Sequence, residues 1–485
     1  MNRRHAMAAM TAWAALPAAA PAAAAAAAVS PGDLRDDIAI LRQALALHPG
    51  LYRYASPREV AERIDRLEQV FLAAPSIEAR YLALSRFLAT IRCGHSYCNF
   101  FNQSDAAART LFDRPTRLPF RFEWIGGRMI VTDASAADLP AGSEVVTVNG
   151  LPAGRMLEAL IGYARADGHN DAKRIALLGV SGSDRIEYFD VFHGLVFGAP
   201  RDGVHRLDVR MPDGRERTVA APAIGLAQRQ ARMAIPAERG DRPAWTWSMG
   251  ADGIAVLTMP DWALYDSAWD WRGWLDQRLG TLGGARGLIV DLRANEGGLD
   301  CGDGLLARLS DRPIVDPRER RLVRFARTPE AIRPHLDTWD RSFHSLGVGA
   351  RPVGNGFLQL VGDRGEDVIA PVGPRITVPV AALIGPVNSS ATFQFAQKAK
   401  RTGLVRLFGE TTGGNRRGIN GGCFFFVRLP ASGIEFDLPL IGYFPPGLPP
   451  DAGIEPDVRV RRSAADIAAG RDPAREAAAA WIRRA

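Results

Sequence analysis

Two adjacent serines stand where an apolar segment gives way to a helix-forming one. Residues 378–384 are apolar throughout, which is typical of a strand covered on both faces. A turn follows, and a helix is expected to begin near Ser390. A hydroxyl at a helix N-terminus lies beside backbone N–H groups that lack a partner within the helix, and such groups can hold an oxyanion. Ser389 or Ser390 could also simply cap the helix, but the position makes Ser390 a candidate nucleophile.

A second apolar segment, residues 287–292, leads to a pair of glycines, Gly297 and Gly298. Glycines let the backbone approach a ligand closely and direct N–H groups into a cleft. Ligands of open α/β sheets bind beyond the carboxyl ends of the strands, where both the glycines and Ser390 are expected. The N–H groups of Gly297 and Ala391, or of Gly298 in place of Gly297, are therefore predicted to hold an oxyanion in an acyl-transfer reaction.

A nucleophilic serine needs a proton acceptor, and this chain offers few. Its only lysines are Lys173, Lys398 and Lys400. The last two lie on the helix that Ser390 opens and run away from its start, and Lys173 lies in a different part of the chain. A histidine is favoured, because its ordinary pKa of about 6.5 suits a base near neutral pH. His95 lies between a glycine and a serine where a long helix stops, so its ring is expected to face a cleft, although helix-end histidines also serve as caps.

Four motifs, in order and spacing, resemble the C-terminal-processing, or tail-specific, serine peptidases. They are residues 287–298 (GLIVDLRANEGG), the serine segment from 388, residues 409–414 (GETTGG) and residues 453–457 (GIEPD). The resemblance covers roughly residues 85 to 460. It implies an α/β catalytic domain of ClpP/crotonase-like fold, a PDZ-like β-rich module, and cleavage near protein C-termini.

Carried onto this chain, the resemblance assigns the nucleophile to Ser390. The glutamate that usually follows is replaced, and the lysine of the lysine-type branch aligns near Asn415. These departures favour the histidine-type branch, which resembles the tricorn core protease and implies His95 as the base. That branch also implies an acid that orients the histidine. Glu455 is the first candidate and Asp451 the second, with Asp437 third. No metal or organic cofactor is implied.

The chain is expected to divide into four parts. Residues 1–28 are an alanine-rich signal peptide, with twin arginines that suggest the twin-arginine route. Residues 29–115 form a helical module that carries His95, residues 116–225 a PDZ-like β-rich module, and residues 226–485 the α/β catalytic domain. Within the last part, the arginine-rich stretch 301–370 is expected to be a lid or a substrate-facing insertion.

The leader predicts export to the periplasm or the exterior. In an oxidising compartment, four cysteines favour disulfides, and the preferred pairs are Cys93 with Cys98 and Cys301 with Cys423, free thiols being the alternative. The net charge of +7 comes mostly from arginines spread along the chain, so nucleic acid is not an expected partner. After the leader no apolar run reaches the ~20 residues that span a bilayer, so stable membrane insertion is not expected either.

These observations predict an exported serine endopeptidase that cleaves peptide or protein tails. One alternative is a catalytically weak or silent binding protein for apolar ligands or peptides on the same scaffold, as in the interphotoreceptor retinoid-binding repeats. The run Phe424-Phe425-Phe426 suits that alternative. A small-substrate esterase or amidase using the same residues is the other. The sequence leaves the oligomeric state open.

Overall fold

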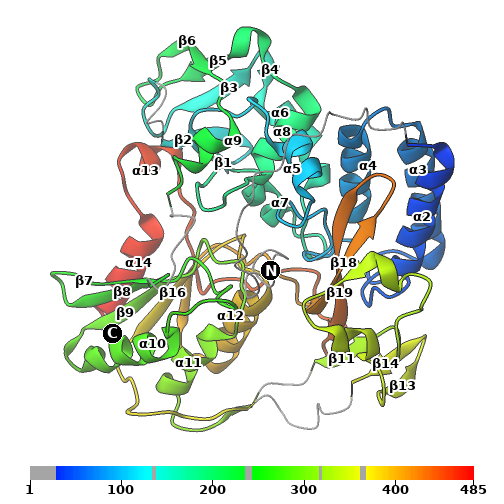
Figure 1. Ribbon diagram of the computed structural model, residues 1–485. Helices are drawn as coiled ribbons and strands as arrows, with labels where there is room; N and C mark the ends of the chain where they lie inside the picture. Colours follow the sequence, from blue (N-terminus) through cyan, green and yellow to red (C-terminus); the bar gives the residue numbers. More distant parts are fainter. Residues whose placement is uncertain (1–28, 134–137, 235–242, 316–318, 361–367) are drawn as a thin grey trace, which may run out of the picture.

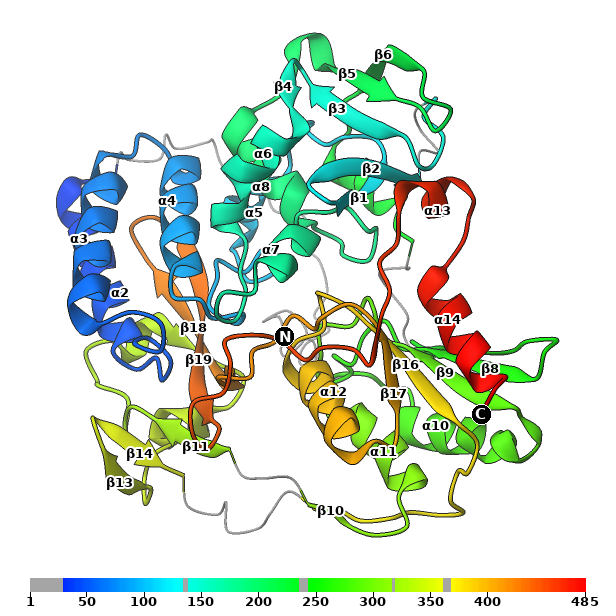
Figure 2. The ribbon, with the colours of Figure 1, turned by 180° about the vertical axis from the view of Figure 1, so that it is seen from behind.

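The computed structural model describes residues 29–133, 138–234, 243–315, 319–360 and 368–485. The expected leader, residues 1–28, lies outside these ranges. Within them, no helix combines the length and the apolar character needed to cross a bilayer. Figures 1 and 2 show three groups of elements: a set of N-terminal helices, a β-rich unit, and an α/β unit that ends near the C-terminus.

Three N-terminal helices form as their capping residues predict. Ser30, Ser56 and Ser76 each accept a hydrogen bond from the third backbone N–H of the helix that follows, and in the first two helices a proline occupies the first position. The helices bury apolar faces against one another and are α2 (Pro31–Leu45), α3 (Pro57–Ala73) and α4 (Ile77–Ala89). A loop after α4 carries His95, and α5 (Asp105–Phe112) follows it.

The β-rich unit is an antiparallel sheet in the order β1-β2-β3-β5-β6, with β4 paired to β3. Asn149 and Gly150 make the turn between β3 and β4 with φ of 53° and 80°, as the Asn-Gly pair predicts. The strands are β1 (Arg121–Ile125), β2 (Arg128–Asp133), β3 (Glu144–Val148), β4 (Leu151–Pro152), β5 (Val204–Arg210) and β6 (Glu216–Pro222). Its helices are α6 (Ala153–Leu160), α7 (Asp171–Leu177), α8 (Tyr188–Phe197) and α9 (Leu226–Gln230).

The α/β unit has a sheet in the order β20-β17-β16-β9-β8-β7, parallel except for β7. Its strands are β7 (Thr246–Met249), β8 (Ile254–Thr258), β9 (Gly287–Asp291), β16 (Val380–Ile384), β17 (Arg406–Gly409) and β20 (Val458–Arg459). Buried side chains of α10 (Trp271–Gly280), α11 (Cys301–Leu309) and α12 (Ser390–Thr402) cover one face, and α14 (Pro473–Ile482) covers the other. Because β9 and β16 are parallel neighbours, the loops after them lie side by side, as the sequence predicts.

A long hairpin near the C-terminus returns to the N-terminal helices. It consists of β18 (Asn420–Leu429) and β19 (Ile434–Phe444), and its inner side chains join the core of α2, α3 and α4. Figures 1 and 2 show the orange hairpin beside the blue helices. The hairpin also anchors strands of the predicted insertion, in the order β12-β18-β19-β11-β14-β13. These are β11 (Arg320–Val323), β12 (Leu336–Asp337), β13 (Arg351–Gly354) and β14 (Phe357–Gln359).

Candidate active site

The turn after β16 holds Ser390 in a strained conformation. Ser390 is the first residue of α12 and has φ of +51°, a value that costs a non-glycine residue about 1–3 kcal/mol and persists only where the surroundings impose it. Buried Asn388 imposes it here. Its side-chain oxygen accepts from Gly385 N at 2.7 Å, and its side-chain nitrogen donates to Leu292 O at 2.5 Å and Asn295 O at 2.9 Å. The result is a sharp strand-to-helix turn that presents Ser390 to a cavity.

The side chain of Asn295 fixes the glycine loop after β9. One of its hydrogen bonds comes from the N–H of Gly297, which was predicted to be an oxyanion donor. Its side-chain oxygen accepts from Gly297 N at 2.8 Å and from Thr392 Oγ1 at 2.7 Å, and its side-chain nitrogen donates to Met259 O. The N–H of Gly297 is therefore committed to the loop itself. The prediction that Gly297 holds the oxyanion is wrong for this geometry.

Two other backbone N–H groups are free to do so. Among the hydrogen bonds of the described residues, neither Gly298 N nor Ala391 N has a partner. The two loops are in direct contact, because a Cβ added to Gly297 would meet the Ala391 nitrogen at 2.9 Å and the Ser390 Cβ at 2.8 Å. Gly298 and Ala391, the other two residues predicted from the sequence, thus remain the available pair.

His95 lies in the loop after α4 and lines the same cavity as Ser390. Gly94 N donates to Asp167 Oδ1 at 2.8 Å, and His95 N donates to Cys93 Sγ at 3.5 Å, which fixes the loop. The His95 ring lies 5.8 Å from that of Phe424. No hydrogen bond joins His95 to Ser390 in the described part of the chain, and the buried His95 Nδ1 has no partner there. The structure therefore brings the candidate base and the candidate nucleophile to one cavity, with no hydrogen bond between them among the described residues.

Burial lowers the pKa of His95 to about 3, and the Arg165 and Lys173 cations act in the same direction. A general base must be neutral, so the fraction of active enzyme should fall only as the pH drops through this low value. We predict that the rate of active-site acylation is nearly the same at pH 5 and pH 7. Labelling rates measured with a fluorophosphonate from pH 4 to pH 8 test this, and a half-maximal rate near pH 6.5 would contradict it. Unfolding should become easier below pH 6.5, because the unfolded ring then takes up a proton that the folded ring does not.

The acids predicted to orient His95 lie elsewhere. Asp451 Oδ2 lies 2.5 Å from Nδ1 of a different histidine, His169, and Asp451 also accepts from Asn415 Nδ2 at 2.7 Å. Glu455 is half exposed and is bonded to Thr411 and Arg459. Both carboxylates thus stabilise the C-terminal stretch rather than His95, which corrects the prediction for Asp451 and Glu455.

Asp437, the third candidate, is buried in β19 and reaches the cavity wall. It accepts from Asn99 Nδ2 and Asn102 Nδ2, both at 2.8 Å. Burial raises the pKa of Asp437 to about 6, although these amides lower it. The carboxylate therefore joins the hairpin to the loop beyond His95, and no hydrogen bond of the described residues connects it to the His95 ring.

Two charged residues that the sequence reasoning missed, Arg165 and Glu296, meet Lys173 at this point. Arg165 donates to Gly94 O, Tyr188 Oη and Glu296 Oε2, each at 2.6 Å. Glu296 in turn lies 3.5 Å from Lys173 Nζ. Burial raises the pKa of Glu296, but the two cations together lower it to about 2. Arg165 thus ties the His95 loop to the glycine loop through an ionised carboxylate.

On the sequence alone, Lys173 was set aside because it lies in a different part of the chain. The structure shows instead that Lys173 reaches the serine turn. The fully buried Lys173 Nζ donates to Ser389 Oγ at 2.6 Å, and Ser389 Oγ donates to Glu296 O at 3.1 Å. The start of α7 is bound to the loop of residues 409–414, because Asn170 Nδ2 donates to Thr412 O and Gly414 O. That loop in turn is bound to the serine turn, because Gly413 N and Gly414 N donate to Asn388 O. The scarcity of lysine in this arginine-rich chain was the one sequence signal that could have singled out Lys173.

A substitution at Lys173 distinguishes the two candidate bases. Lys173 contacts Ser389, the neighbour of the proposed nucleophile, so Lys173→Met should leave the labelling rate of Ser390 within about tenfold of wild type. His95→Ala should lower that rate by about 10²–10⁴-fold, the usual contribution of a general base. Measuring both rates with one fluorophosphonate checks this. If Lys173→Met were the more damaging change, the lysine would have to be the base.

The four cysteines are free, so the predicted disulfides are absent from this structure. Cys93 Sγ instead accepts from Asn420 Nδ2 at 3.4 Å, and Cys98 lies within the core of the N-terminal helices. Cys301 is buried in the core of the α/β unit, whereas Cys423 packs against the core that the hairpin shares with the N-terminal helices. The predicted pair of Cys301 and Cys423 therefore falls in two separate cores.

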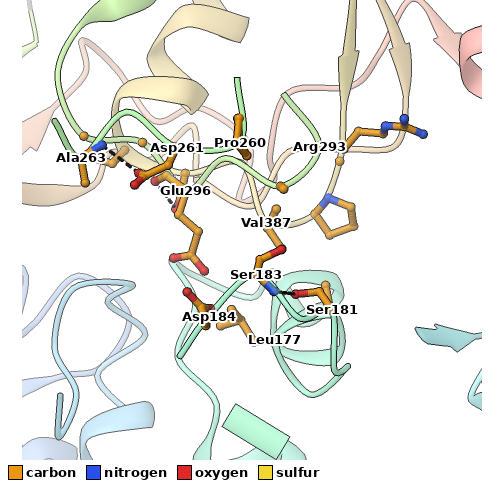
Figure 3. A pocket seen from close by; sticks show the side chains of 18 of the residues that line it. Leu177, Ser181, Ser183, Asp184, Pro260, Asp261, Ala263, Arg293, Glu296 and Val387 are labelled. Carbon is orange, nitrogen blue, oxygen red and sulfur yellow. Dashed lines mark hydrogen bonds between the residues drawn. The ribbon is translucent and has the colours of Figure 1, made fainter. Parts of the chain in front are cut away.

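The cavity that contains Ser390 and His95 has a volume of about 1640 Å³. All three groups of elements line it, as does the insertion through Trp339 and Phe343. Figure 3 shows one end, where Glu296 from the glycine loop points across the cavity toward Asp184 of the β-rich unit, with Asp261 nearby. Burial raises the pKa of Asp184 to about 7, and the Glu296 carboxylate contributes to the rise.

A strained serine at a helix start, two N–H groups without a partner among the described residues and a neutral histidine on the same cavity are groups that a serine-type peptidase site requires. Residues 253–460 match Peptidase family S41. The sequence-based recognition of the fold and the class of enzyme is thereby confirmed.

Solved structures share this fold at low sequence identity. Mature CPAF complexed with lactacystin is 15% identical, with a TM-score of 0.58, over 94% of this chain and 97% of that one. Mature CPAF alone is 16% identical, with a TM-score of 0.57, over 93% and 96% of the two chains. No curated protein matches the sequence.

Proposed function

We propose that the protein is an exported endopeptidase that cleaves peptides or protein tails through an acyl-enzyme on Ser390. One observation carries the proposal: Ser390 is held at φ of +51° at the start of α12, in contact with a loop whose Gly298 N–H is free. His95 removes the proton from Ser390 Oγ as this oxygen attacks the peptide carbonyl carbon. Gly298 N and Ala391 N donate to the oxyanion that forms.

The second half of the reaction reverses these roles. His95 gives its proton to the leaving amine as the peptide C–N bond breaks, which leaves the acyl group on Ser390. Water then attacks the ester carbon while His95 takes a proton from it, and the carboxylic acid product leaves as Ser390 recovers its proton. The ring has no carboxylate partner among the described residues, so the base acts as a histidine–serine pair.

The size of the cavity supports large substrates. Small-molecule pockets usually enclose about 300–1,000 Å³, and the cavity here reaches about 1640 Å³. This volume favours a peptide over the small ester or amide of the alternative. Cleavage near C-termini and export follow from the resemblance and the leader, and they form part of this proposal.

Covalent labelling tests the proposal directly. The mature protein is incubated with a fluorophosphonate and weighed intact, and the adduct is then located by peptide mapping. We expect one adduct per chain, on Ser390, absent from Ser390→Ala and slowed in His95→Ala. Lactacystin, with which mature CPAF has been complexed, provides a second probe. No adduct under conditions that label a control serine protease would favour the binding-protein alternative.

A further inference from the structure

Three aromatic side chains form one wall of the cavity beside His95. Phe424 lies on β18, Trp339 in the loop after β12, and Phe343 in the short 3₁₀ helix η5 (Arg341–Ser345). The Trp339 ring lies 5.2 Å from that of Phe343 and 5.9 Å from that of Phe424. We call these three residues the aromatic wall. Each of the three is only partly buried, so the wall presents apolar surface to the cavity.

The wall packs against a buried ring of β18. Along β18, Phe425 points into the core shared with the N-terminal helices, whereas Phe426 packs its ring 5.8 Å from Trp339. The β18–β19 register shifts between Gly421 and Phe424, which is the mark of a β-bulge. Bulges next to active sites redirect a side chain, and here the redirected residue is Phe424, whose ring lies 5.8 Å from that of His95.

The wall lies next to His95, and this position indicates which part of a substrate it would contact. His95 must reach both Ser390 and the leaving amine, so a side chain that touches the His95 ring lies within one residue of the bond that is cut. Elsewhere the cavity presents carboxylates, such as Asp184 and Glu296, whose surface suits polar or cationic groups. Other aromatic residues, such as Tyr97 and Phe100, also line the cavity. The wall combines three large flat apolar rings with a position next to the base, and such rings gain by covering an apolar or aromatic group.

We propose that the aromatic wall is a specificity subsite that takes an apolar, preferably aromatic, side chain of a substrate residue adjacent to the scissile bond. This inference rests on the proposed peptidase function and adds the substrate class to it. Residues 301–370 were expected to form a lid or a substrate-facing insertion. Trp339 and Phe343 belong to that stretch and line the cavity, so the proposal gives the insertion a role in binding substrate.

Binding to an inactive chain tests the wall without requiring turnover. In a Ser390→Ala background, calorimetry compares tetrapeptides of alanine with tetrapeptides in which one position carries phenylalanine or aspartate. We expect phenylalanine at one position to tighten binding at least about tenfold over alanine, the scale of discrimination that an apolar pocket gives. Adding Trp339→Ala should reduce that ratio to about threefold or less, and Trp339→Phe should retain most of it.

Phe357→Ala is the matched control. Phe357 is a half-buried aromatic residue of the same insertion that packs against Phe444 outside the cavity, so its loss should leave the ratio unchanged. A thermal melt of each variant identifies any that fail to fold. If Trp339→Ala fails to fold, Phe343→Leu supplies an independent test. Unchanged preference in folded Trp339→Ala and Phe343→Leu overturns the subsite.

Failure of the subsite and failure of the peptidase proposal give different results. Peptide diphenyl phosphonates with phenylalanine or alanine at the reactive position phosphonylate an active serine irreversibly, because its oxygen bonds to phosphorus as phenoxide leaves. Their rates are measured on chains that retain Ser390. Reaction at Ser390, together with an unchanged calorimetric preference in folded Trp339→Ala and Phe343→Leu, overturns the subsite and leaves the peptidase proposal standing. A phenylalanine preference in calorimetry without any phosphonate or fluorophosphonate adduct would support the wall as a ligand site and contradict the peptidase proposal.

Discussion

Replacing Ser390 by alanine should lower kcat for peptide cleavage by at least about four orders of magnitude. Removing the nucleophile of a serine protease leaves only the catalysis due to substrate binding and the oxyanion site. Residue 390 is held at φ of +51°, and this conformation strains alanine as it strains serine. The substitution should therefore change the stability of the fold little. The assay is the release of product from a quenched fluorescent peptide, with thermal unfolding as the check on folding.

The neighbouring serine provides the control for this prediction. Ser389 is buried, caps α12 by position, and its hydroxyl is bonded to Lys173 Nζ and Glu296 O. Ser389→Ala should therefore lower stability by about 1–3 kcal/mol, the cost of leaving the lysine without this acceptor, and should retain most of the activity. Equal loss of kcat in both variants would show that the nucleophile had been assigned to the wrong serine.

Gly298→Ala should be the second most damaging change. Gly298 has φ of +139°, a backbone region that alanine rarely adopts, and an added Cβ would lie 2.2 Å from the backbone carbonyl of Trp262. The loop must then move, and it carries one of the two free N–H groups with it. Loss of one oxyanion donor costs about 10²–10³ in kcat, so we expect a loss of that size with a smaller change in KM.

Gly283→Ala is the matched control for the glycine, because a Cβ there meets nothing within 4 Å and its φ is not in the strained range. Steady-state kinetics of the two variants separate the effects on kcat and KM. A Gly298→Ala enzyme with normal kcat would mean that the oxyanion is held elsewhere. Retained fluorophosphonate labelling in such a variant would point to the same conclusion.

Local sequence patterns predicted the elements of the fold well. Serine caps with proline after them located α2 and α3, and uniformly apolar runs located β9 and β16. Because parallel neighbouring strands end at the same sheet edge, these patterns also predicted that Ser390 and the glycine pair meet. His95 was selected by elimination and by its place at a helix end, and it lines the same cavity as Ser390.

The partners of the site residues could not be predicted, because they depend on packing between distant segments. Asp451 and Glu455 have the right chemistry for orienting His95, yet their backbones place them against His169 and Arg459. Lys173 was rejected because it belongs to another unit, although one helical turn of α7 is enough to bring it to Ser389. The sequence around Gly297 does not show that its N–H donates a hydrogen bond to the side chain of Asn295, two positions earlier.

The hairpin β18–β19 has a consequence for the order in which the protein is made. His95 belongs to the first hundred residues, but its surroundings are completed by Asn420, which bonds Cys93, by Gly421 beside the ring, and by Phe424. A ribosome therefore releases more than three hundred further residues before the histidine acquires its setting. On the proposed mechanism, the nascent chain is inert as a hydrolase through almost all of its synthesis, and a product truncated before residue 420 stays inert.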